Sequence, residues 1–99
     1  MSLEVWIGTI EVSYFHPDNP GTRRNAFTTV TTWASNSDEF AEKCDRMLRD
    51  YGWTLLGVER ASRVPEEGEY SEEVEGMLER TRSNPNAIIY GTFHSYPVM

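Results

Sequence analysis

Four side chains in this sequence are suited to acid–base chemistry: His94, Glu11, Glu59 and Tyr90. An imidazole titrates near neutral pH, and a neighbouring carboxylate can orient it and stabilise its protonated form. The sequence therefore supports the hypothesis that His94 acts as a general acid or base, with Glu11 or Glu59 as its partner. The alternative is that all four are solvated polar residues on a half-exposed sheet, without a catalytic role.

The other residues that could take part in chemistry are better explained by structural roles. His16 and His94 are the only histidines, and we expect them at different ends of the fold, which predicts no metal site. Cys44 is the single cysteine, so an internal disulfide and a CxxC pair are excluded. Its place on an apolar helix stripe is typical of a buried, unreactive thiol. Because phosphate-binding glycine loops, HExxH helices and nucleophile elbows are absent from the sequence, we expect no cofactor.

Length and charge narrow the class of protein. The 99 residues include 9 Lys+Arg and 16 Asp+Glu, a net charge of −7, and 38% of them are hydrophobic. This composition is typical of one globular domain over residues 1–99. The acidic balance argues against binding to nucleic-acid phosphates. Without a long apolar run or a visible secretory signal, we expect a cytoplasmic protein that does not bind membranes.

The local patterns predict the element order ββαβαβ. Residues 4–15 and 25–34 are rich in β-branched and aromatic residues, and the turn-forming run 16–21 joins them into an antiparallel hairpin. Residues 53–64 and 87–96 are predicted as the third and fourth strands.

Two helices are predicted between these strands. The first follows Asn36, which can form a capping box with Glu39, although Ser35 or Ser37 could also serve as the cap. Gly52 is predicted to end this helix. Its buried stripe is expected to contain Phe40, Cys44, Met47, Leu48 and Tyr51. The second helix begins near Ser71, and its inward stripe is Val74, Met77, Leu78 and Thr81.

This order predicts an α+β fold, specifically a two-layer open-faced sandwich with a four-stranded mixed sheet and both helices on one face. Strand alternation divides the side chains between the two faces of the sheet. The set expected to face the helices is Trp6, Ile10, Val12, Tyr14, Val30, Leu56, Val58, Ile89 and Phe93. A register error of one residue would exchange the two sets in a strand.

The opposite sheet face is the candidate binding surface, because it is too apolar for a solvated face and too polar for a second core. The candidate binding residues are Phe27, Thr31, Trp33, Tyr90 and Tyr96. We expect self-association into a homodimer to bury the apolar residues of this face. These residues are Val5, Ile7, Phe27, Trp33, Leu55, Ile88, Tyr90 and Tyr96. The monomeric alternative is a curled sheet, or a segment 61–70 that folds over the face.

The leading functional hypothesis is therefore a small, soluble, acidic binding or interaction domain that self-associates through its open sheet face or holds a small ligand there. The second hypothesis is the small enzyme that uses His94. The third is an acidic inhibitor or immunity-type protein that neutralises a basic protein, since the acidic run from Glu66 to Glu79 contains no Lys or Arg. The same run is also typical of a loop followed by a solvated helix start.

Overall fold

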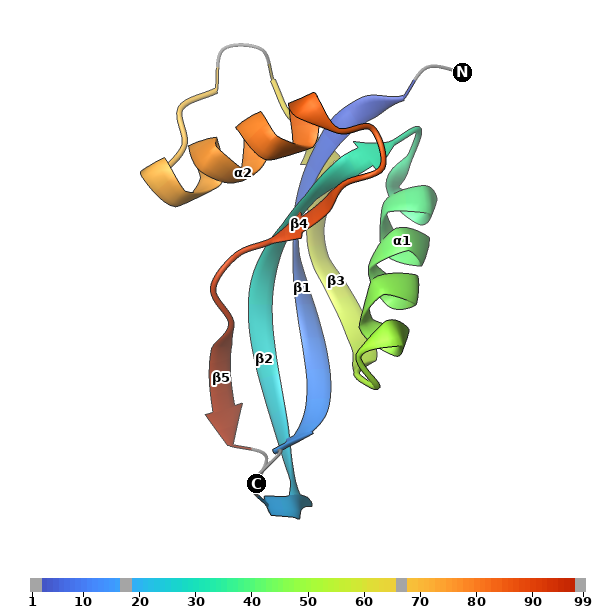
Figure 1. Cartoon of the computed structure of the whole chain (residues 1–99), viewed down its shortest axis with the longest axis vertical. Coiled ribbons are helices and arrows are strands. Elements are labelled where there is room, and N and C mark those ends of the chain that lie inside the picture. The colour runs from blue at the N-terminus through green and yellow to red at the C-terminus, as the bar shows by residue number, and fades with distance from the viewer. Residues whose placement is uncertain (1–2, 17–18, 66–67, 98–99) are drawn as a thin grey trace.

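The structure is a computed structural model that describes residues 3–16, 19–65 and 68–97 (Figure 1). Its strands form one sheet in the order β3-β1-β2-β4, and β5 also pairs with β2. The strands are β1 (Glu4–His16), β2 (Asn19–Ala34), β3 (Thr54–Arg63), β4 (Ile88–Tyr90) and β5 (His94–Pro97). The helices are α1 (Ser37–Asp50) and α2 (Glu72–Ser83). Since β4 and β5 lie one after the other along β2, together they form one interrupted edge strand.

The hairpin prediction is confirmed, and the hairpin is longer than expected. β1 pairs with β2 from Glu4 opposite Ala34 as far as His16 opposite Asn19. β2 therefore begins inside the run predicted as a turn, of which Pro17 and Asp18 lie outside the described residues.

The predicted helix starts are confirmed by their capping hydrogen bonds. The Asn36 side chain accepts a 2.8 Å hydrogen bond from the backbone N–H of Glu39, and the Ser71 hydroxyl accepts one from Val74. Each bond satisfies an N–H in the first turn that has no partner within the helix. Gly52, with φ of 75°, takes the left-handed conformation that ends α1 as predicted.

The main core lies between α1 and one face of the sheet. Phe40, Cys44 and Leu48 are buried there against a cluster that includes Ile10, Val12, Ala26, Val30 and Ala34. Gly8 allows the closest approach, because a Cβ at this position would lie 2.7 Å from the ring of Phe40 and would also meet the backbone oxygen of Arg60. The predicted apolar stripe of α1 is confirmed at Phe40, Cys44 and Leu48, and Met47 is partly buried against the same core. Tyr51 was wrongly included, because it follows the last residue of α1 and is 61% exposed.

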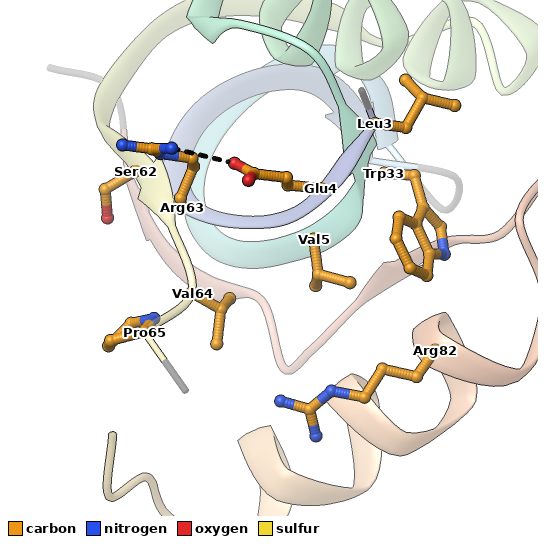
Figure 2. Close-up of a pocket in the computed structure, with 9 residues that line it drawn as sticks. All are labelled: Leu3, Glu4, Val5, Trp33, Ser62, Arg63, Val64, Pro65 and Arg82. Atoms are coloured by element: carbon orange, nitrogen blue, oxygen red, sulfur yellow. Dashed lines mark hydrogen bonds and ion pairs between the residues drawn. The ribbon is translucent and has the colours of Figure 1, made fainter. Parts of the chain in front are cut away.

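The α+β class is confirmed, but α2 lies on the other face of the sheet. Val30 belongs to the core under α1, whereas its neighbour Thr31 places its hydroxyl 2.8 Å from that of Thr81 in α2. Figure 2 shows α1, in faint green, and α2, in faint orange, on opposite sides of the strands. α2 covers only the end of that face where β1 begins (Figure 1). The sheet and α1 therefore form an open-faced pair of layers, and part of the second face stays open.

The expected mixed sheet with both helices on one face was wrong for a topological reason. β3 pairs antiparallel with β1, and β4 pairs antiparallel with β2. β3 and β4 consequently run in opposite directions, and the handedness rule for parallel crossovers does not fix the side of α2. No helix in the described ranges is long and apolar enough to cross a membrane.

The third strand also departs from simple alternation. The register between β1 and β3 shifts at two points, which leaves Leu56 and Glu59 as extra residues on β3. Leu55 and Val58 both pack against the α1 core, while 41% of Leu56 is exposed. The expected inward position of Leu56 and outward position of Leu55 were therefore wrong, because each β-bulge interrupts the alternation. Ile89 was also misplaced, since it pairs with Thr31 on the α2 side.

Candidate functional site

The structure separates the four acid–base candidates. His94 is paired with Phe27, and Phe27 with Glu11, so His94 and Glu11 share a face but lie two strands apart. Two interstrand spacings correspond to about 10 Å between their backbones. Glu59 lies one strand farther away on β3, and Tyr90 turns toward the α1 face, where it contacts Phe93. This geometry adds no support to a catalytic pair that contains His94.

The candidate binding residues are divided between two faces. Phe27, Thr31 and Trp33 alternate along the face of β2 opposite α1. Thr31 is buried under α2, Trp33 is half-buried at the edge of α2, and Phe27 lies farther along the strand. Tyr90 lies on the α1 face, and the side chain of Tyr96 lies outside the described residues. α2 therefore covers one end of this sheet face and leaves the other end open.

A groove of about 770 Å³ lies where α2 meets the ends of β1, β2 and β3 (Figure 2). Val5 and Trp33 project into it from the sheet, and Val64 and Pro65 form its far wall. The wall is held to the sheet by the hydrogen bond from Val64 N–H to the backbone oxygen of Val5, at 2.9 Å. The full lining is Leu3, Glu4, Val5, Trp33, Ser62, Arg63, Val64, Pro65 and Arg82.

Two arginines border this groove, and they differ in their partners. Arg63 is paired with Glu4 at 3.1 Å. Arg82 has no hydrogen-bond or ion-pair partner among the residues that the structure describes, and Figure 2 shows its guanidinium extended beneath Val5 and Val64. An apolar floor with one available guanidinium suits a ligand that combines an apolar body with an anionic group.

A second cavity, of about 70 Å³, lies on the α1 face among aromatic rings. Its lining is Met47, Leu48, Tyr51, Trp53, Tyr90 and Phe93. This site was not predicted from the sequence, because Tyr90 was expected on the other face of the sheet. The signal that could have revealed it was the pair Tyr51 and Trp53 on either side of Gly52, where α1 turns into β3.

Two titratable side chains in the described part of the chain have a shifted pKa. Burial raises the pKa of the Cys44 thiol from 9.0 to about 12, which is consistent with an inert core cysteine. A hydrogen-bonding interaction with Tyr51 raises the pKa of Tyr90 above its ordinary value, with smaller contributions from burial and charge. In the described part of the chain, no group of three or more His, Cys, Asp or Glu side chains is arranged to hold a metal ion.

The acidic run is partly a structural feature of α2. The Glu73 carboxylate accepts a 2.8 Å hydrogen bond from the backbone N–H of Thr92 and a 3.2 Å bond from its hydroxyl. These bonds join α2 to the segment between β4 and β5. Glu66 and Glu67, where the predicted run begins, lie outside the described residues.

No family model, curated protein or solved structure matches this chain. Its function is therefore inferred from its own residues and geometry.

Proposed function

We propose that the chain is a small binding domain that holds its ligand in the groove between α2 and the sheet face opposite α1. The observation that carries this proposal is the groove itself, whose volume of about 770 Å³ falls within the usual range for small-molecule sites, roughly 300–1,000 Å³. Val5 and Trp33 supply apolar contact, and Arg82 supplies a charged hydrogen-bond donor at one side. The ligand class is an apolar molecule with a carboxylate.

The groove is also held in shape before a ligand arrives. The indole nitrogen of Trp33 donates a hydrogen bond to the backbone oxygen of Thr81 in α2, at 2.6 Å, and Lys43 donates to the backbone oxygen of Trp33. Trp33 is therefore fixed between both helices, with its only polar side-chain atom already bonded. A fixed apolar wall loses little conformational entropy on binding, which favours affinity.

The proposal is tested with 1-naphthoate and its uncharged counterpart 1-naphthalenemethanol as probes. In ¹⁵N-resolved NMR titrations we expect 1-naphthoate to shift the backbone signals of Val5 and Val64 and the indole signal of Trp33. Arg82→Gln should weaken naphthoate binding about three- to tenfold, because a charge-assisted hydrogen bond is lost at an exposed site. The alcohol should bind the wild type and the variant equally.

Arg80→Gln is the matched control, since it removes the same charge from the same helix outside the groove lining. It should leave naphthoate affinity unchanged. If neither probe shifts the groove signals, the proposal is rejected. Equal losses in Arg80→Gln and Arg82→Gln would reduce the role of Arg82 to general electrostatic attraction.

Self-association through the open end of the same face is the second candidate. Phe15 lies on this face beyond α2, and 61% of its surface is exposed. The apolar area that this face offers to a second copy is smaller than predicted, because Leu55, Ile88 and Tyr90 turn toward α1. A dimer would consequently depend on Phe15 and Phe27.

Sedimentation at micromolar concentration tests this candidate. A mass near twice 11.4 kDa that is lost in Phe15→Glu and Phe27→Glu, and retained in Tyr90→Glu, would support a dimer through this face. A mass of 11.4 kDa at all concentrations would reject it. A basic protein partner for the acidic run, catalysis by His94 and a cytoplasmic location stay predictions.

A further inference from the structure

We propose that the aromatic cage, defined as the cavity walled by Tyr51, Trp53, Tyr90 and Phe93, binds the trimethylammonium group of a small molecule. This site lies on the α1 face of the sheet, whereas the groove lies on the face covered by α2. The inference therefore goes beyond the proposed function and does not depend on it.

The four rings meet at steep angles and form walls instead of a stack. Trp53 and Phe93 have centroids 5.1 Å apart at 73°, and Tyr90 and Phe93 are 5.4 Å apart at 59°. Tyr51 stands at 83° to Tyr90, with centroids 6.4 Å apart. Trp53 is also stacked on Tyr14, with ring centroids 4.4 Å apart, which holds the indole in place.

The chemistry of this lining selects a methylated cation. Aromatic faces carry partial negative charge and attract a cation within about 6 Å of the ring centroid. Met47 and Leu48 complete the lining without a charged group. An unmodified ammonium would lose the water bonded to its three N–H donors and find few acceptors here. A trimethylammonium group has no N–H to satisfy, so entry costs it less.

Size and access agree with such a ligand. The cavity is small, with a volume of about 70 Å³, so it takes a compact methylated head while the rest of the ligand stays in solvent. Tyr51 and Tyr90 are 61% and 40% exposed, so the cavity can be reached without unfolding. The net charge of −7 attracts cations to the protein from solution.

The neighbouring surface favours a small molecule over a basic peptide. An adjoining depression shares Met47 and Tyr51 with the cage and is also lined by Lys43, Arg46 and Asp50. Two cationic side chains there would repel the additional positive charges of a lysine-rich segment. A single trimethylammonium head with a neutral or anionic remainder carries fewer positive charges and meets less of this repulsion.

The first experiment compares choline with 3,3-dimethylbutan-1-ol, in which carbon replaces the quaternary nitrogen. In NMR titrations we expect choline to shift the Trp53 indole signal while the Trp33 indole signal stays in place, which separates the cage from the groove. The neutral isostere should bind at least about tenfold more weakly, since it lacks the attraction to the rings. Equal binding of both compounds, or no shift of Trp53 with choline, would overturn the proposal.

Variants provide the second readout. Tyr90→Leu and Tyr51→Leu should each weaken choline binding about two- to tenfold, whereas Tyr90→Phe, which keeps the ring, should bind nearly as well as the wild type. Phe15→Leu is the control for loss of an exposed ring elsewhere, and unchanged urea unfolding midpoints establish that each variant is folded. If Tyr90→Phe loses as much affinity as Tyr90→Leu, the rings are not the binding groups. A trimethyllysine peptide that binds more tightly than choline would overturn the assignment to a small molecule.

Discussion

The indole nitrogen of Trp33 donates a 2.6 Å hydrogen bond to the backbone oxygen of Thr81. This oxygen lies in the last turn of α2, where carbonyl groups need partners from outside the regular helix. Thr31, two residues earlier on the same strand face, places its hydroxyl 2.8 Å from the hydroxyl of Thr81. One residue of α2 is therefore bonded to two residues of β2, and this attachment sets the distance between α2 and the sheet at the groove.

Thr81→Val should destabilise the protein by about 1–3 kcal/mol, because it leaves the buried hydroxyl of Thr31 without this partner. Replacing both threonines by valine should cost less than the sum of the two single substitutions, since neither hydroxyl is then left alone. Urea unfolding of the wild type, the two single variants and the double variant measures the difference. Strictly additive effects would show that the two hydroxyls do not interact.

A pair of glycine substitutions should change stability in opposite directions. Gly8→Ala should destabilise by about 1–3 kcal/mol, because the new methyl group would overlap the ring of Phe40 and the backbone of Arg60. Gly76→Ala should stabilise by up to about 1 kcal/mol, because Gly76 lies inside α2 with open space around its Cα. Thermal unfolding of both variants checks the signs. A stable Gly8→Ala protein would contradict the close packing of Phe40 on β1.

Leu48→Ala should destabilise by about 2–5 kcal/mol, because Leu48 is only 1% exposed in the α1 core. Leu56→Ala is the matched control on the bulged strand, and we expect a loss below about 1 kcal/mol there, since much of Leu56 is already in water. Chemical denaturation gives both values. Similar losses at the two positions would mean that β3 pairs with β1 in another register.

Local sequence signals were sufficient to predict the helices and strands of this fold, but not the face of the sheet on which α2 lies. The caps at Asn36 and Ser71 and the end of α1 at Gly52 depend on neighbours a few residues away, so the sequence contained them. The place of α2 depends on which strand β4 pairs with. Composition and periodicity do not specify such a pairing, and the handedness rule applies only to parallel strands.

The faces on which the candidate site residues lie could be predicted only in part, because they also depend on strand pairing and register. Phe27 and Trp33 were assigned to the correct face because β2 alternates without interruption through this region. Tyr90 was assigned to the wrong face because β4 contains only three residues, too few for alternation to define its register. The bulges that expose Leu56 and Glu59 carry no signal in the sequence that distinguishes them from regular strand positions.

The final prediction concerns the alkaline limit of stability. Burial raises the pKa of Cys44 from 9.0 to about 12 in the folded protein. At pH values between these two, the unfolded chain loses the thiol proton while the folded chain keeps it. The contribution of Cys44 is therefore fully present below pH 9 and decreases as pH rises toward 12, with a slope of up to about 1.4 kcal/mol per pH unit in the free energy of unfolding.

Cys44→Ala isolates this contribution from every other effect of alkaline pH on the free energy of unfolding. The variant should be less stable than the wild type at about pH 8, because a buried side chain has been shortened. The difference between the two proteins should then shrink by about 1 kcal/mol or more as the pH is raised to about 10, since only the wild type has the thiol. Urea unfolding of both proteins at the two pH values measures this change. A stability difference that stays constant would show that the Cys44 thiol ionises equally in the folded and unfolded chains, which contradicts its burial against Ile10 and Val30 in the core.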